Sequence, residues 1–307
     1  MSLLVVGTVA FDKIETPFGK TEKILGGAAT FIGMAASMLD VKTGIVSVIG
    51  EDFPDEYVEL MESKNLDLAG IEKVKGGKTF YWSGRYHNDM NSRDTLVTEL
   101  NVLENFQPEV PVGWRKPDVL MLGNLHPLVQ KSVLNQLEER PKLVVLDTMN
   151  FWMDLTWNEL MDVLKDVDVL TINDEEARQM SKEYSLVKAA KKILEMGPHT
   201  LIIKKGEHGA LLFHENNVFF APALPLEDVF DPTGAGDTFA GGFSGFLAKT
   251  QNYSFENMKR AIIYGSALAS FTVEKFGTDR LAELTDEDLV DRLDVFKSLT
   301  NFDIELD

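Results

Sequence analysis

The sequence predicts an α/β fold: a doubly wound, mostly parallel central sheet flanked by helices, with a small antiparallel β lid. Two observations predict the sheet. Short apolar runs alternate with segments long enough for crossover helices, and the runs are continuous, which is typical of strands buried on both faces. A third observation predicts the lid, because residues 78–100 contain two strand-like runs with no helix between them.

Six apolar runs are the predicted strands of the sheet. They are Leu3–Val6 before Gly7, Gly44–Ile49 before Gly50, Asp118–Leu122 before Gly123, Leu143–Leu146 before Asp147, Asp168–Ile172 before Asn173 and Leu201–Ile203 before Lys204. Ligands of doubly wound sheets bind at the carboxyl ends of the strands, so we expect the functional site among these terminal residues.

The predicted hairpin pairs residues 79–83 with residues 95–98. We expect one domain over residues 1–307, with a lid formed by inserted segments at roughly 13–25 and 74–106. A hairpin that merely decorates a sheet edge is the alternative. The apolar residues Tyr81 and Trp82 would suit a homodimer formed through the lid. A lid arginine, Arg85 or Arg93, either meets a phosphate on the substrate or is simply solvated.

Composition excludes several classes of function. The chain has no cysteine, which rules out disulfides, cysteine–zinc sites and a thiol nucleophile, and which fits a cytoplasmic protein. A net charge of −19 argues against a nucleic-acid partner. The five histidines show no metal-ligand spacing. The opening apolar run is too short for a signal peptide or a membrane span, so we expect no membrane partner.

The most informative segment is Asp231–Phe243. Pro232 marks a turn, residues 234–236 are small enough for a tight backbone curl, and a helical pattern follows. The curl therefore lies at a helix N-terminus, where free amides and the helix dipole attract an anion. Amides directed at a phosphoryl group in transfer stabilise its negative charge.

Asp237 lies in the first turn of this helix, beside the expected anion. A carboxylate there can accept the proton of an acceptor hydroxyl, or it can be only a favourable first-turn residue. Gly241, Gly242 and Gly245 follow inside the helix, where each glycine costs about 1 kcal/mol relative to alanine. They indicate close packing against another element or a ligand.

The segment Asp231–Gly242 resembles the C-terminal signature of the ribokinase family, also called the PfkB carbohydrate kinases, and the likeness extends over essentially the whole chain. The resemblance implies ATP-dependent phosphorylation of a hydroxyl of a small sugar-like molecule, with Mg²⁺. It makes Asp237 the catalytic base and assigns the anion hole to Gly234, Ala235 and Gly236.

The same resemblance assigns the acceptor side of the site. Asp12, in the run Gly7–Asp12, matches the aspartate that holds sugar hydroxyls. Gly26 and Gly27 match a glycine pair that lets the backbone approach the substrate, although a plain loop-to-helix turn also explains them. Phe31 stands where sugar kinases often carry asparagine, which allows a flatter or less polar substrate.

On the nucleotide side, Asn173-x-x-Glu176 resembles a motif that arranges magnesium, water and phosphate, and we expect Glu176 to act through water. The same spacing is a helix capping box, and both roles can hold together. By the same resemblance, the residues beside the nucleotide are Lys204, Gly206, Gly209, Ser266 and Gly277. Asp231 and Thr233 match positions that bind a monovalent cation such as K⁺ in some members.

The leading interpretation is transfer of the ATP γ-phosphoryl group to a sugar, polyol or nucleoside hydroxyl. A nucleoside or inositol kinase is the alternative within the family. A catalytically silent structural or regulatory subunit is the alternative from another class, and such proteins usually lack the base or the anion-hole glycines. No Gly-x-Gly-x-x-Gly follows the first strand, which argues against a dinucleotide oxidoreductase. No Walker-type phosphate loop is present either, so the kinase interpretation depends on the late glycine segment.

Overall fold

The computed structural model describes residues 1–301, in which nine strands build the main sheet. They are β1 (Ser2–Val6), β5 (Lys42–Gly50), β6 (Leu66–Val74), β9 (Val119–Leu122), β10 (Leu143–Asp147), β11 (Val169–Asn173), β12 (Thr200–Lys204), β13 (Ala210–His214) and β14 (Asn217–Ala221). Their spatial order is β14-β13-β12-β11-β10-β9-β1-β5-β6. All neighbours from β12 to β6 are parallel, and β13 and β14 join antiparallel at one edge. The predicted sheet is confirmed, and each of the six predicted runs is one of its strands.

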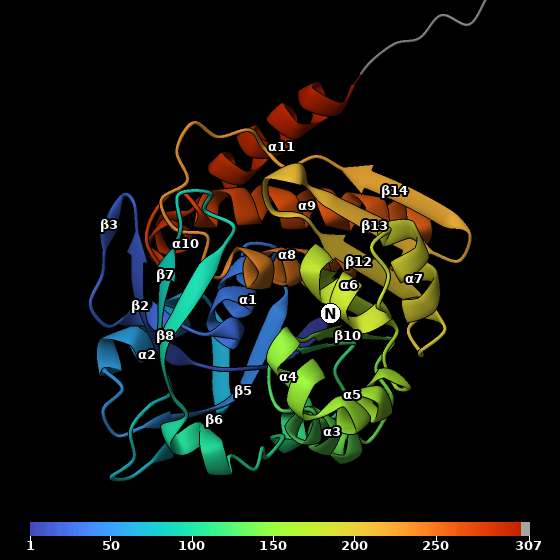
Figure 1. Ribbon diagram of the computed structural model, residues 1–307. Helices are drawn as coiled ribbons and strands as arrows, with labels where there is room; N and C mark the ends of the chain where they lie inside the picture. The colour runs from blue at the N-terminus through green and yellow to red at the C-terminus, as the bar shows by residue number, and fades with distance from the viewer. Residues whose placement is uncertain (302–307) are drawn as a thin grey trace, which may run out of the picture.

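Helices cover both faces of the main sheet (Figure 1). One face carries α1 (Ala28–Ser37), α2 (Asp55–Ser63), α8 (Ala235–Thr250), α9 (Phe255–Thr272), α10 (Asp279–Glu283) and α11 (Asp286–Thr300). The other carries α3 (Pro127–Gln136), α4 (Asn150–Leu155), α5 (Trp157–Leu164), α6 (Asp174–Ser181) and α7 (Leu186–Leu194). Short 3₁₀ helices are η1 (Asn101–Asn105), η2 (Val112–Trp114) and η3 (Gly206–His208).

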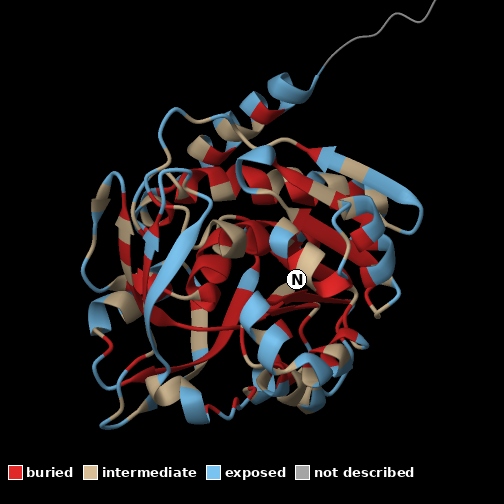
Figure 2. Ribbon diagram, in the orientation of Figure 1, coloured by how far each residue is buried: buried red, intermediate tan, exposed pale blue. Residues whose placement is uncertain are grey.

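Strand β1 shows why its run is apolar throughout. Leu3 and Val5 belong to the core on the α1 side, whereas Leu4 and Val6 belong to the core on the α3 side, and all four are fully buried. Successive side chains of a strand point to opposite faces, so a strand with helices on both faces needs an apolar residue at every position. Figure 2 shows this buried centre in red.

A second sheet lies beside the main one, at the left of Figure 1. We call it the lid sheet. Its strands are β2 (Ala10–Thr16), β3 (Gly19–Lys20), β4 (Ile24–Gly26), β7 (Tyr81–Tyr86) and β8 (Arg93–Glu99). The predicted hairpin is confirmed, since β7 and β8 pair antiparallel. The other pairings are antiparallel too, except that β2 and β7 run parallel.

Helix α8 packs unusually closely on its neighbours. A Cβ atom added to Gly241 would lie 2.4 Å from the Ile32 carbonyl oxygen of α1, and one added to Gly242 would lie 2.9 Å from Gly265 Cα of α9. No side chain fits in either gap. These glycines therefore pack against helices, which is the first of the two explanations that the sequence allows.

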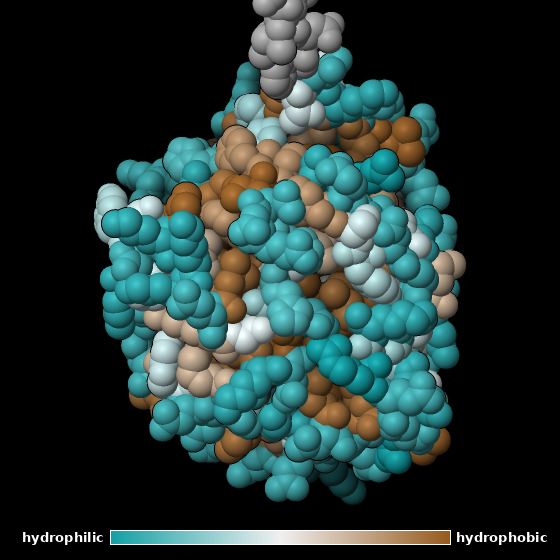
Figure 3. Space-filling view, turned by 90° about the vertical axis from the view of Figure 1, so that its right-hand side faces the viewer, coloured by the Kyte–Doolittle hydropathy of each residue, from teal (hydrophilic) through white to brown (hydrophobic). Residues whose placement is uncertain are grey.

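The surface on the right-hand side of Figure 1 is mostly hydrophilic, with hydrophobic residues in separate small groups (Figure 3). Among residues 1–301, no helix is both long and apolar enough to cross a membrane.

Candidate active site

Polar residues end three neighbouring parallel strands at one edge of the main sheet. Asp147 ends β10, Asn173 ends β11 and Lys204 ends β12. Because the strands are parallel, these residues emerge on the same side, as the sequence predicts for a ligand site. Helix α8 begins beside them: a Cβ added to Gly236 would lie 3.2 Å from Lys204 Nζ.

The chain enters α8 through a left-handed residue. Gly234 has φ 76° and ψ −3°, and a Cβ there would lie 2.5 Å from ring atoms of Phe31. The first N–H groups of a helix lack partners within the helix. Here the Ala235 N–H donates to the Pro232 carbonyl at 3.2 Å, and the Thr238 N–H donates to the Gly234 carbonyl at 2.8 Å. The start of α8 therefore depends on the left-handed conformation of Gly234, and its Ala235 N–H already has an acceptor in the Pro232 carbonyl.

Asp237 is densely surrounded, although part of its surface stays accessible. Burial raises the pKa of its carboxyl from 3.8 to about 7, and the negative charge of Asp147 adds to this shift. The positive charges of Lys204 and Arg93 act in the opposite direction on that pKa. A carboxyl with a pKa near neutrality is suited to proton transfer at physiological pH.

Lys204 and Asp147 form an ion pair, with 2.9 Å between Lys204 Nζ and Asp147 Oδ2. Burial raises the pKa of Asp147, and Lys204 opposes that shift. The sequence marks Asp147 only as a strand end. Its partner lies 57 residues away, so no local pattern could have found the pair.

Asn173 and Glu176 form the predicted capping box at the start of α6. The Glu176 N–H donates to Asn173 Oδ1 and the Asn173 N–H donates to Glu176 Oε2, both at 2.8 Å. Burial, followed by the charge of Asp147, raises the pKa of Glu176 to about 7. Among residues 1–301, no group of three or more His, Asp or Glu side chains is arranged to hold a metal. Because Oε1 of Glu176 has no hydrogen-bond partner among residues 1–301, this residue fits a magnesium ion held through water.

Asp12 lies on β2, where it is 5 % exposed. A Cβ on Gly26 would lie 1.9 Å from Asp12 Oδ2, and Gly27, with φ 93°, would collide with the Thr8 carbonyl. The glycine pair therefore brings backbone against the Asp12 carboxyl. Burial raises the pKa of Asp12 to about 7, with further contributions from Asp231 and Asp237. Asp12 and Asp237 thus belong to one electrostatic environment.

The carbohydrate kinase family called pfkB has a sequence model that matches residues 3–284. The chain belongs to the PfkB family of carbohydrate kinases. It is accordingly a kinase, and the family resemblance of the sequence is confirmed.

Two relatives are similar to this PfkB kinase over most of its length. It is 31% identical to the cytidine kinase of Thermococcus kodakarensis over 254 residues, which are 79% of this chain and 87% of that protein. It is 25% identical to a nucleoside kinase of Methanothermobacter thermautotrophicus over 306 residues, 90% of each chain.

Solved structures of PfkB kinases share the fold. The nucleoside kinase of Methanocaldococcus jannaschii superposes with a TM-score of 0.77 at 20% identity, covering 96% of this chain and 99% of that one. The aminoimidazole riboside kinase of Salmonella enterica, solved with aminoimidazole riboside and an ATP analog, gives a TM-score of 0.75 at 20% identity, with coverage of 95% and 100%.

In this PfkB kinase the lid sheet lies over the site. Its tip is the hairpin end, residues 86–93. The Thr233 hydroxyl donates to the Tyr86 phenol oxygen at 3.2 Å, and a Cβ on Gly206 would lie 2.5 Å from Asn91 Oδ1. The lid tip therefore touches both the segment before α8 and the turn after β12. Two surface cavities, of about 460 and 600 Å³ beside β6, are lined by none of the predicted site residues.

The two lid arginines differ. Arg85 pairs with Glu15 at 3.0 Å on the surface, so for Arg85 the solvated alternative describes the structure. Arg93 lies opposite Tyr86 in the hairpin, and its charge lowers the pKa of both Asp237 and Glu176. Arg93 is thus the lid arginine whose positive charge acts on the carboxyl groups of Asp237 and Glu176.

The remaining predicted site residues lie on several elements. Phe31 is 1 % exposed, and its ring packs on Gly234 rather than facing open space. Gly206 and Gly209, with φ 55° and 79°, flank the turn η3 after β12. Ser266 is a buried residue of α9, and Gly277 follows that helix.

Asp231 is 0 % exposed, and burial raises its pKa. Its carboxylate accepts from the Thr233 and Gly277 N–H groups, each at 2.9 Å, and no ion pair among residues 1–301 includes it. A buried carboxylate without a cationic side chain fits a monovalent cation. The cation role that the family resemblance implies for Asp231 and Thr233 stays a prediction.

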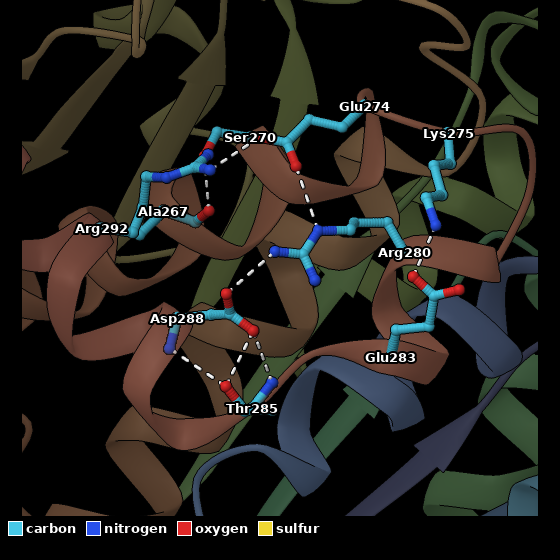
Figure 4. Close-up of polar contacts among 9 residues, drawn as sticks. All are labelled: Ala267, Ser270, Glu274, Lys275, Arg280, Glu283, Thr285, Asp288 and Arg292. Carbon is cyan, nitrogen blue, oxygen red and sulfur yellow. Dashed lines mark hydrogen bonds and ion pairs between the residues drawn. The ribbon is translucent and has the colours of Figure 1, made fainter.

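A charged cluster fixes the loop that supplies Gly277 (Figure 4). Glu274 accepts from Arg280 Nε at 3.1 Å and from Arg292 Nη2 at 2.6 Å. Both guanidinium groups lie over the Phe271 ring, with centroid distances of 4.9 and 3.7 Å. The cluster ties α9, α10 and α11 together around the segment 274–280, whose Gly277 N–H donates to Asp231.

Proposed function

We propose that this protein transfers the γ-phosphoryl group of ATP to the primary hydroxyl of a nucleoside. The observation that carries the proposal is Asp237, whose pKa of about 7 gives a proton acceptor at the glycine-formed start of α8. ATP is the proposed donor because solved family members were determined with an ATP analog or with ADP, as in an ADP complex of a Cryptococcus ribokinase.

A nucleoside acceptor is supported by the relatives, of which the cytidine kinase is 31% identical. Asp12, with Gly26 and Gly27 beside it, would hold the sugar hydroxyls. The buried ring of Phe31 packs against Gly234. Another sugar-like molecule, such as ribose or inositol, is the alternative acceptor, and the acceptor panel below distinguishes them.

In the proposed reaction the acceptor oxygen attacks the γ-phosphorus as its proton passes to the Asp237 carboxylate. The bond from the γ-phosphorus to the bridging oxygen breaks, and ADP leaves. The amides of residues 234–236 stabilise the charge on the transferred group. Glu176 would hold Mg²⁺ through water, and the ion would neutralise phosphate charge.

The nucleotide would lie along Asn173, Lys204, Gly206, Gly209, Ser266 and Gly277, and a K⁺ ion would lie at Asp231 and Thr233. Closure of the lid, formed by segments near 13–25 and 74–106, would keep water from competing with the acceptor.

The exposed residues of β8, which include Leu96 and Val97, support a homodimer through the lid. We place the protein in the cytoplasm because the chain has no cysteine.

The test measures ADP release with a panel of cytidine, uridine, adenosine, inosine, ribose, fructose and inositol. We expect turnover with a nucleoside, and we expect Asp237→Asn to lose about 10²- to 10⁴-fold in kcat while still binding ATP. Asp286→Asn is the matched control, because Asp286 is also a first-turn carboxylate but is exposed on α11. Near-normal turnover by Asp237→Asn would refute the mechanism. Wild-type protein that consumes no ATP with any acceptor would favour the catalytically silent alternative.

A further inference from the structure

The positively charged ammonium group of Lys204 lies beside the N-terminus of α8. The side chain is 16 % exposed, and Nζ is 3.2 Å from the position of a Cβ on Gly236, in the first turn of α8. The N-terminus of a helix carries the positive end of its dipole, so a cation beside it is unfavourable in itself. Such an arrangement is stabilised when an anion enters between the two.

Asp147 accounts for only part of the bonding capacity of Lys204. An ammonium has three N–H donors. Lys204 Nζ makes one hydrogen bond among residues 1–301, to Asp147 Oδ2 at 2.9 Å. Two donors are therefore left for a ligand, and the Asp147 carboxylate fixes the side chain at the end of β12.

We propose that Lys204 is a second catalytic residue of this kinase: its ammonium binds an oxygen of the transferred γ-phosphoryl group opposite the amides of α8. This extends the nucleotide contact expected from the sequence, and it rests on the proposed function. Lys204 stays protonated throughout. The acceptor proton goes to Asp237, the bond between the γ-phosphorus and the bridging oxygen breaks, and the lysine only stabilises the charge of the group in transfer.

Asp147 is then a positioning residue, which acts by holding Lys204. It also has a stability role, because Lys204→Met would leave Asp147 buried near Glu176 and Asp237 without its cation. Removing one partner of a buried pair destabilises a protein, whereas removing both partners is often neutral. The double variant Lys204→Met/Asp147→Asn therefore separates catalysis from folding.

The first measurement compares affinities for the β,γ-imido analog of ATP and for ADP by calorimetry, without acceptor. A charge-assisted contact to the γ-phosphoryl group predicts that Lys204→Met and the double variant bind the ATP analog about 10- to 100-fold more weakly, with ADP affinity unchanged within about threefold. Asp147→Asn keeps the ammonium and should keep the preference for ATP. Lys205→Met is the matched control, because the neighbouring Lys205 lies over the Phe220 ring instead.

The second measurement is kcat. Loss of one donor to a transition-state oxyanion predicts a fall of about 10²- to 10³-fold in both variants that lack the lysine. A folded double variant that is no slower than Asp147→Asn, or that still prefers the ATP analog, would overturn the proposal. Equal loss of affinity for both nucleotides would also overturn it, since that is the signature of a purely structural role.

The two proposals can fail separately. If the wild type accepts no nucleoside but the lysine variants still lose the ATP preference, the acceptor assignment is wrong and the role of Lys204 stands. If Asp237→Asn is inactive while the double variant keeps wild-type kcat, the role of Lys204 is wrong and the proposed function stands.

Discussion

The Thr233 hydroxyl donates a hydrogen bond to the phenol oxygen of Tyr86 at 3.2 Å, and this bond joins the lid sheet to the segment that leads into α8. Tyr86 is 6 % exposed although it belongs to the small sheet. Thr233 is two residues from Asp231 and four from Asp237. The lid sheet is therefore hydrogen-bonded to the segment that leads into the helix of the proposed base.

Tyr86→Phe keeps the ring and removes this hydrogen bond. We expect stability to fall by about 0.5–1.5 kcal/mol and acceptor-independent ATP hydrolysis to rise a few-fold relative to transfer, because water reaches the site more often. Parallel assays of ADP and phosphorylated product measure this partition. The control is Tyr184→Phe, since Tyr184 is 89 % exposed. An unchanged partition in Tyr86→Phe would show that the bond does not control closure.

The pH dependence of turnover should report the raised pKa of Asp237, which is about 7. Asp237 must be deprotonated to accept a proton, so kcat/KM should rise with pH up to about 7 and level off above it. Below pH 7 we expect a fall of about tenfold per pH unit. Initial rates from pH 5 to 9 with saturating Mg²⁺ measure the profile, and a flat acid side would exclude Asp237 as the base.

The free energy of unfolding of the ligand-free protein should fall as pH rises, whereas kcat/KM should increase. The pKa of Asp12, Glu176 and Asp237 is about 7 in the folded chain but close to 4 when unfolded, so the folded state binds more protons between these values. The free energy of unfolding should therefore decrease as pH rises from about 4 to 7.

The same reasoning predicts that Asp12→Asn raises the free energy of unfolding by about 3–4 kcal/mol at pH 7.5 and has little effect at pH 4. Urea titrations at the two pH values measure this difference. Asp286→Asn, which alters an exposed carboxylate, should show no such pH dependence. A stability loss in Asp12→Asn at pH 7.5 would contradict the electrostatic account.

Gly234→Ala should damage the start of α8. Its φ of 76° disfavours any side chain, and the new Cβ would lie 2.5 Å from the Phe31 ring. We expect a loss of about 1–3 kcal/mol in stability together with a fall in kcat. Gly113→Ala is the control, because nothing lies within 4 Å of its Cβ position. Phe31→Leu in the Gly234→Ala background should recover part of the stability, and a purely additive double variant would argue against the contact.

Glu274→Gln should weaken the cluster of Figure 4. It removes the charge that pairs with Arg280 and Arg292, all three being about a quarter exposed or less. We expect a loss of about 1–2 kcal/mol in thermal unfolding, with the loop that holds Asp231 loosened. Glu283→Gln breaks an exposed pair with Lys275 and should cost less. Equal costs would mean that the cluster has no special role.

The parts of this structure that depend on local pattern were predictable. The six buried strands have unbroken apolar runs, and the Asn173–Glu176 capping box spans only three residues. Strand β6, Leu66–Val74, was not predicted because it lies at the sheet edge and many of its side chains are partly exposed. Its sequence therefore lacks a continuous apolar run.

Long-range contacts of the site were not predictable from pattern. The pair of Asp147 with Lys204 requires β10 and β12 to lie on either side of β11. The contact of Tyr86 with Thr233 joins residues 147 positions apart. Only the folded chain brings these residues together, so the sequence marked the strand ends without identifying their partners.

The close contact of Gly241 with Ile32 has a consequence for how such a kinase can diversify. It leaves no room for a side chain between α1 and α8, so the segments at the starts of these two helices cannot shift independently. Asp12 and Tyr86 lie outside this helix pair, in the lid sheet. We therefore expect evolutionary changes of substrate to accumulate in the lid sheet, where mutations leave the helix pair unchanged.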